Sequence, residues 1–170
     1  GLGDVYKRQT YIDEKISYPY SMIDKIVPSY SETVQKHLQE CEFENNQAVS
    51  AGNSWYAVVV NAEEAQYLVI EDDFPNGRPA LEKVGVIFTD RETVNKVERM
   101  KVGTCLNPLH TTLAVYGCLL GYTLVADEMK DAELTRLIER IGYDEGLKVV
   151  VDPGVINPKA FITELLEKRL

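Results

Sequence analysis

The sequence predicts an α/β segment that is followed by a mostly helical one. Before residue 90, apolar runs rich in valine, isoleucine and aromatic residues are separated by clusters of glycine, proline and asparagine. After Thr89, apolar residues recur at helical spacing. We therefore expect strands to dominate up to about residue 89 and helices beyond it, with a domain boundary near residues 90–105.

The first segment is expected to be mainly extended. Residues 18–28 are apolar and bracketed by prolines, which is typical of a strand or loop. A capping box formed by Ser29 and Glu32 predicts one helix that runs to about Glu40, and the polar residues 45–53 are turn-like. Three strands are expected after that, over residues 55–60, 67–70 and 84–89.

The second segment carries start and stop signals for four helices. Their expected starts are the capping box of Thr89–Glu92, Asn107–Pro108, the residues before Leu134, and Asn157–Pro158. Asn107 and Asn157 are each expected to be an N-cap followed by proline at the first helical position. Gly121 and Gly142 are expected to end the second and third of these helices.

Composition and charge exclude several classes of protein. Among 170 residues, 18 Lys+Arg stand against 27 Asp+Glu, giving a net charge of −9. This balance argues against nucleic-acid partners and anionic membrane surfaces, because both need clustered positive charge. Three cysteines without a CxxC pattern are typical of reduced thiols in a cytoplasmic protein. The sequence contains no apolar run of the roughly 18 residues that a membrane span needs, and no secretory leader is recognised.

The stretch from Lys101 to His110 concentrates side chains that can do chemistry. It holds an amine, a carboxamide (Asn107) and an imidazole around one expected helix start. Together these groups can hold a carbonyl or hydroxyl oxygen and move its proton. Taken singly, each has an ordinary structural role, as a surface lysine, an N-cap and a structural histidine. A metal site formed by Cys105, His110 and Cys118 is not expected, because their spacing matches no zinc pattern.

Four segments of the chain carry a family resemblance. They are residues 19–26, residues 68–81, the Lys101–His110 motif and residues 151–154. On these segments, residues 17–170 resemble the mannitol dehydrogenase family, the long-chain, metal-independent polyol and uronate dehydrogenases. Within that family, the amino-acid sequence of residues 105–110 is most similar to the fructuronate reductase (mannonate oxidoreductase) branch.

The resemblance implies a division into domains. Residues 10–98 would be the C-terminal part of a Rossmann-type nucleotide-binding domain, and residues 99–170 would begin a helical catalytic domain. Residues 1–9 look like a translated sequencing adapter and are expected to be a non-native leader, so we expect an internal fragment of a longer enzyme. NAD or NADP would then be bound mainly by residues outside the fragment.

The resemblance also implies the activity. Lys101 would be the acid–base, Asn107 and His110 would bind the reacting oxygen, and Ile23 and Asp24 would line the substrate and nicotinamide pocket. The substrate would be a small sugar acid, a hexuronate of the D-mannonate/D-fructuronate type, whose secondary alcohol or ketone exchanges a hydride with the nicotinamide. A mannitol or other polyol 2-dehydrogenase and a non-catalytic helical binding module are the alternatives.

One spacing departs from the family pattern, which has one residue fewer between the lysine and the asparagine. If Asn107 starts a new helix, the extra residue can lie in the connection. If one α-helix runs through the motif, Lys101 would instead be rotated by about 100°.

Overall fold

A computed structural model of the chain describes residues 2–25, 27, 30–62 and 67–170, without the side chains of Leu2 and Asp24. The chain divides into two compact units. One consists of Gly1–Met22 together with Val69–Leu170, and the other is Ile23–Leu68. None of the described helices is long and apolar enough to cross a lipid bilayer.

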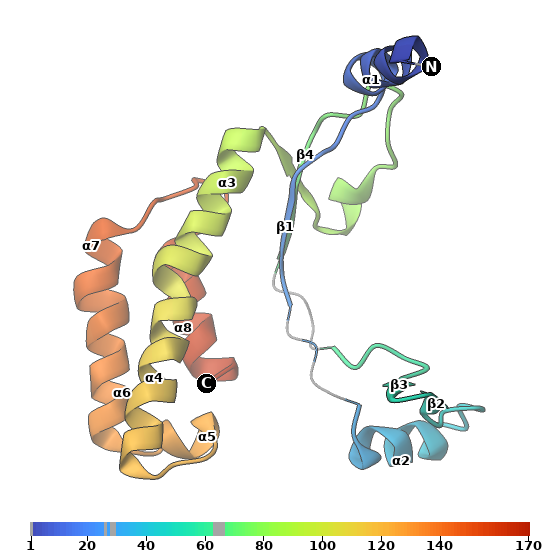
Figure 1. The fold of residues 1–170 in the computed structure, drawn as a ribbon. Coiled ribbons are helices and arrows are strands. Elements are labelled where there is room, and N and C mark those ends of the chain that lie inside the picture. The colour runs from blue at the N-terminus through green and yellow to red at the C-terminus, as the bar shows by residue number, and fades with distance from the viewer. Residues whose placement is uncertain (1, 26, 28–29, 63–66) are drawn as a thin grey trace. The chain divides into compact units, whose positions relative to one another are not determined.

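A small sheet contains the strands β1 (Ser21–Asp24), β4 (Tyr67–Glu71) and β5 (Ile87–Thr89), in that order (Figure 1). Helix α1 (Leu2–Lys15) precedes it in the chain. Strands β4 and β5 are parallel, with Val69 opposite Ile87. Parallel neighbours need a long crossover, and residues 72–86 supply it. The strands predicted near residues 67–70 and 84–89 are therefore confirmed.

Strand β5 begins three residues later than predicted. Leu81–Val84 form the 3₁₀ turn η1 instead, which ends on Gly85 at φ 92°. That left-handed conformation is one that glycine adopts without strain, and it reverses the chain just before the strand.

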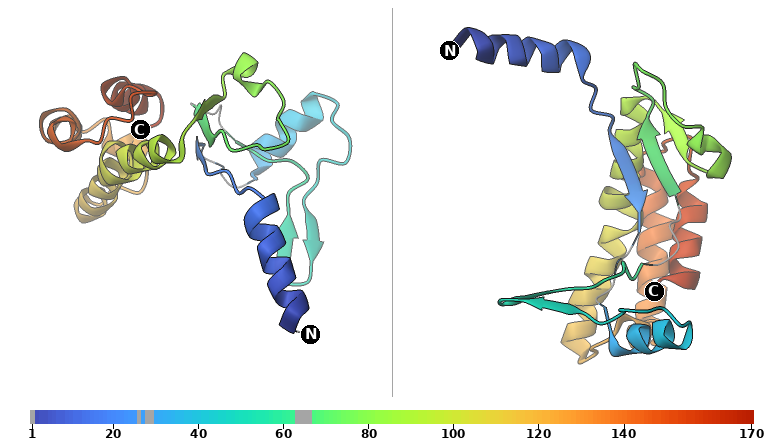
Figure 2. Two further views of the ribbon diagram at one scale, coloured as in Figure 1. Left: turned by 90° about the horizontal axis from the view of Figure 1, so that it is seen from above. Right: turned by 90° about the vertical axis from the view of Figure 1, so that its right-hand side faces the viewer.

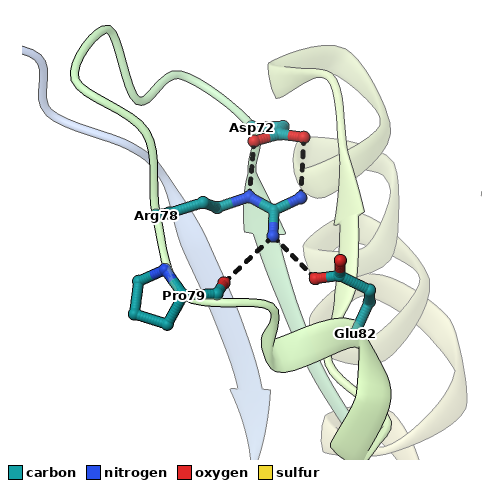
Figure 3. A network of polar contacts seen from close by, with 4 residues as sticks. All are labelled: Asp72, Arg78, Pro79 and Glu82. Atoms are coloured by element: carbon teal, nitrogen blue, oxygen red, sulfur yellow. Dashed lines mark hydrogen bonds and ion pairs between the residues drawn. The ribbon is translucent and has the colours of Figure 1, made fainter.

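The guanidinium of Arg78 holds the crossover together (Figure 3). Its Nε and Nη2 donate to the two carboxylate oxygens of Asp72 at 2.7 and 3.0 Å. Its Nη1 donates to Glu82 at 2.7 Å and to the carbonyl of Pro79 at 3.2 Å. The guanidinium carbon lies 3.3 Å from the centre of the Phe88 ring, a cation–π contact with strand β5.

A second arginine joins the sheet to the helices. Arg91, the first residue of α3 (Arg91–Met100), donates through Nε to both carboxylate oxygens of Glu71 at 3.0 Å. Its guanidinium carbon lies 4.1 Å from the centre of the Tyr20 ring, and Tyr20 N donates to Glu71 at 3.0 Å. The end of β4 is thereby fixed to the start of α3.

Helices dominate the rest of this unit, as predicted. They are α3, the π-helix η2 (Lys101–Cys105), α4 (Asn107–Leu120), α5 (Val125–Glu128), α6 (Ala132–Glu139), the π-helix η3 (Arg140–Gly146), α7 (Leu147–Val149) and α8 (Pro158–Lys168). The run α3–η2–α4 forms one rod, and α6–η3–α7 forms a second rod that runs antiparallel beside it (Figure 1). Helix α8 lies alongside both rods, as the view from above shows (Figure 2).

The core of this unit lies between the two rods and α8. Its fully buried large side chains are Val97, Met100, Cys105, Leu109, Leu113, Ile138, Ile162 and Leu165. The predicted face of α3 is confirmed, because Val94, Val97 and Met100 are all buried. Each fully buried aliphatic side chain of this kind contributes about 1.5–3 kcal/mol.

Two helix ends behave as predicted, and three do not, the third of which is the start of α4. Asn157 caps α8, because its Oδ1 accepts from Ala160 N at 2.9 Å, and Gly121 ends α4 at φ 90°. The cap of α3, however, is Asp90 rather than Thr89. Gly142 does not end a helix, since α6 continues through it as η3.

The prediction that Asn107 is an N-cap is wrong. Leu106 occupies that position without a side-chain hydrogen bond, and Asn107 is the first residue of α4. An N-cap residue needs extended backbone, but the chain arrives here already helical through η2, and Leu106 has φ −119° and ψ −67°. The exposed Asn107 carboxamide makes no hydrogen bond within the described part of the chain.

The described residues of the second compact unit include a helix and a hairpin. Helix α2 (Glu32–Glu40) is capped by Ser31, whereas the predicted cap Ser29 lies outside the described residues. Strands β2 (Val49–Ala51) and β3 (Ser54–Tyr56) pair antiparallel around Gly52 at φ 61°. The predicted strand at 55–60 is therefore shorter than expected, and its partner falls in the segment expected to be a turn.

The Arg78 network predicts a pH-dependent crossover. Arg78 lowers the pKa of Asp72, and the backbone amide of Glu82 together with Arg78 lowers the pKa of Glu82. Because both folded pKa values lie below the unfolded ones, the stabilisation is complete above about pH 5 and is lost as the pH falls through the folded values. The NMR ring signals of Phe88 should shift in that acid range, and Arg78→Gln should abolish the shift. An unchanged titration in the variant would contradict the network.

Asn157 and Asn107 can be compared directly, because each stands before a proline at a helix start but only Asn157 caps its helix. Asn157→Ala should lower the free energy of unfolding by about 1 kcal/mol, because a cap is lost, whereas Asn107→Ala should change it by less than about 0.5 kcal/mol. Urea denaturation of the chain measures both. Equal losses would show that Asn107 has a structural role after all.

Candidate functional site

Lys101 is the first residue of the π-helix η2 and is half-buried. The turn is closed by Leu106 N, which donates to the carbonyl of Lys101 at 2.9 Å. This bond spans five residues, one more than the bond of an α-helix. The backbone carbonyl of Lys101 is thus held by the residue that directly precedes α4.

The π turn bears directly on the unusual spacing of the motif. The sequence left two alternatives for the extra residue between Lys101 and Asn107, a loose connection or a continuous α-helix. The structure contains neither, because the helix continues but widens by one residue over Lys101–Cys105. A π turn of this kind is how a helix takes up a single extra residue, and such turns are frequent at functional sites. The spacing was the signal in the sequence, and sequence reasoning missed the π turn itself.

His110 is held by the same backbone carbonyl that begins α4. Its backbone N donates to Leu106 O at 3.1 Å, and its ring Nδ1 lies 3.3 Å from that oxygen. A carbonyl oxygen only accepts, so this contact assigns the ring hydrogen to Nδ1. In the neutral ring, Nε2 then has a lone pair and accepts a hydrogen bond.

Asn107 and His110 share one face at the start of α4. They are three residues apart in a helix, which places their Cβ atoms about 5–6 Å apart. Leu106 links them to Lys101, since its N–H is bonded to Lys101 and its carbonyl to His110. One continuous helical segment therefore carries the amine, the carboxamide and the imidazole.

The other two predicted residues lie in the second compact unit. Ile23 is in strand β1, and its side chain is 45% exposed. The side chain of Asp24 lies outside the described residues. That these two residues join the Lys101 motif in one pocket stays a prediction.

Cys105, which lies within the motif, is a poor metal ligand. Cys105 is fully buried, and burial raises the pKa of its thiol to about 11, so it stays protonated at neutral pH. Metal binding needs the thiolate. Among the described residues there is no group of three or more His, Cys, Asp or Glu side chains that could hold a metal ion.

Comparison with known proteins identifies relatives over most of the chain. No family model matches it. It is 56% identical over 163 residues to D-mannonate oxidoreductase of Thermotoga maritima, a match that covers 94% of this chain and 30% of that protein. It is 36% identical over 129 residues to Polyol:NADP oxidoreductase of Gluconobacter oxydans, covering 76% of this chain and 24% of that protein.

A solved structure agrees with these relatives. The ternary complex of Pseudomonas fluorescens mannitol 2-dehydrogenase with NAD and D-mannitol matches with a TM-score of 0.68 and 28% identity. The match covers 95% of this chain and 30% of that protein, so the chain spans about a third of the relatives' length or less. Sequence and fold agree over nearly the whole chain, and the chain belongs to the mannitol dehydrogenase family.

Proposed function

We propose that the protein carrying this chain is an NAD(P)-dependent oxidoreductase that acts on a hexuronate. It would interconvert D-mannonate and D-fructuronate by moving a hydride between the secondary carbon and the nicotinamide. The observation that carries this proposal is the 56% identity to a D-mannonate oxidoreductase across the segment that holds the Lys101–His110 motif.

Lys101 is proposed as the acid–base. A secondary alcohol is far too weak an acid to release its proton unaided near neutral pH, so hydride loss needs a base at the oxygen. The neutral Lys101 amine would take that proton in the oxidation, and its ammonium would return it to the ketone oxygen in the reduction. The π turn supports this role, because it lets the extra residue be absorbed without an added α-helical rotation of the lysine.

Asn107 and His110 are proposed to hold the substrate. The Asn107 carboxamide has no capping duty, so its N–H groups can donate to the reacting oxygen as negative charge develops there. The Nδ1 of His110 donates to the carbonyl of Leu106, so its Nε2 would accept from the substrate hydroxyl. The two side chains therefore suit complementary hydrogen bonds on one alcohol.

The cofactor would be NAD or NADP, which supplies or accepts the hydride. The residues of this chain proposed to line its nicotinamide end are Ile23 and Asp24. Ile23 supports this, because it is 45% exposed and its apolar side chain suits a flat nicotinamide ring. The sequence contains no Gly-x-Gly-x-x-Gly turn for the phosphates. This chain would accordingly contact the nicotinamide end of the cofactor. Residues 10–98 would be part of the nucleotide-binding domain, and residues 99–170 would be the start of the catalytic domain. The three free cysteines support a cytoplasmic location.

A polyol dehydrogenase is the second candidate. It is favoured by the Polyol:NADP oxidoreductase match and by the solved neighbour, which holds D-mannitol. The higher identity to the mannonate enzyme ranks the hexuronate first. A non-catalytic helical module of the same fold is the alternative from another class.

A chimeric enzyme tests these candidates. The matched segment of this chain would replace its counterpart in the Thermotoga maritima relative, and NAD(P)H oxidation would be followed with D-fructuronate and with D-fructose. Lys101→Ala should lower kcat by at least about 10²-fold, the usual scale for loss of a general acid–base. Asn107→Ala should lower it too, while leaving the stability of the fold nearly unchanged.

The control is Lys96→Ala, which removes an exposed lysine paired with Glu92 on α3 and should leave kcat unchanged. Turnover of fructose in preference to fructuronate would select the polyol alternative. A chimera that folds and binds the cofactor, yet is indifferent to Lys101→Ala, would exclude the catalytic role.

A further inference from the structure

The two π turns of the helical unit are packed against each other. Turn η2 lies in the first rod and η3 in the second, and the two are in contact. At this contact the second rod presents Gly146, the last residue of η3, which is buried. The residue of η2 that faces Gly146 is Thr104, the fourth residue of that turn.

Gly146 is required here by space and not by conformation. Its φ of −61° and ψ of −47° are ordinary helical values that any residue adopts. A Cβ atom at this position would lie 3.1 Å from Cγ2 of Thr104 and 3.0 Å from the carbonyl oxygen of Ile141. Both separations are shorter than a normal van der Waals contact, so an added methyl group would displace one or both turns.

A displacement of Thr104 would reach Lys101 through the backbone of η2. The two residues belong to one turn, which is closed by the hydrogen bond between Leu106 N and the carbonyl of Lys101. The side of η2 that faces the core is fixed by Cys105, which is fully buried. A shift of Thr104 away from Gly146 would therefore move the backbone of the turn that also carries Lys101.

We infer that Gly146 is a positioning residue for Lys101. By allowing η3 to approach Thr104 closely, it sets the geometry of the π turn from which the lysine side chain projects. This inference rests on the proposed function, in which Lys101 is the acid–base. Proton transfer is sensitive to such placement, since a misplacement of 1 Å can cost about 10²-fold in rate.

The test is a methyl swap across the contact, made in the chimeric enzyme. Gly146→Ala adds a methyl group and should lower kcat by about 10-fold, with a smaller change in KM. Thr104→Ser removes the opposing Cγ2 and should restore kcat when it is combined with Gly146→Ala. A merely structural role would show a loss of stability without this reciprocal recovery of kcat.

Gly142→Ala is the matched control. Gly142 lies one turn earlier on the same rod, but its missing Cβ faces Ile162 at 3.2 Å and Leu109 at 3.5 Å, not η2. This variant should lower the Tm and leave kcat of the folded enzyme unchanged. An equal fall of kcat in both glycine variants would overturn the inference, because the effect would then not be specific to Thr104.

The remaining outcomes also decide the matter. An unchanged kcat in Gly146→Ala, or a loss that Thr104→Ser does not restore, contradicts the positioning role. If Gly146→Ala does not fold, Thr104→Ala tests the same contact from η2. It should lower kcat about 3-fold, because the turn loses its support from Gly146. An unchanged kcat in Thr104→Ala would contradict the inference. Lys101→Ala distinguishes a failure of this inference from a failure of the proposed function. If this variant does not lower kcat, the acid–base role of Lys101 itself is rejected.

Discussion

The helical unit depends on one hydrogen bond, from the amide of Leu106 to the carbonyl of Lys101. It closes a turn that holds one residue more than an α-helical turn, and so it sets how α3 leads into α4. The same residue, Leu106, then serves His110, whose backbone and ring both contact the Leu106 carbonyl. This bond ties the residue that carries the amine to the turn that precedes the imidazole. With it, they are parts of one rod whose core side is filled by Cys105 and Leu109.

Much of the fold follows from local signals in the sequence. The strands that contain residues 67–70 and 87–89, the helices beyond Thr89, the cap at Asn157 and the end of α4 at Gly121 all depend on residues close in the chain, and they are confirmed. Helix α1 (Leu2–Lys15) was not predicted. The errors arise where packing against other helices or an irregular turn overrides a local signal. Gly142 is typical of a helix end, but it lies within η3, where its lack of a side chain leaves room for Ile162 and Leu109. Asn107 reads as a cap, but the preceding π turn removes the extended backbone that a cap requires.

The candidate site was predictable in its members but not in its geometry. The residue types and their spacing indicate Lys101, Asn107 and His110. The tautomer of His110 cannot be read from the sequence, because it depends on a carbonyl that the π turn directs at the ring. Asn107 was expected to cap α4, but its carboxamide does not cap the helix and is therefore available to a substrate. The acidic stretch that begins at Glu71 is likewise a structural device, in which each of two arginines is neutralised by carboxylates of the sheet and its crossover.

The buried thiol of Cys105 has a consequence for chemical labelling. With a pKa of about 11 and no exposed surface, almost none of it is thiolate at neutral pH, so alkylating reagents and oxidants cannot reach or react with it. Cys41 and Cys118 are exposed and modify readily. Cys105 lies inside η2, so its modification requires that this turn separate from the core. The molecule therefore carries a native reporter of opening at the very segment that would hold its base, with two exposed thiols as internal standards.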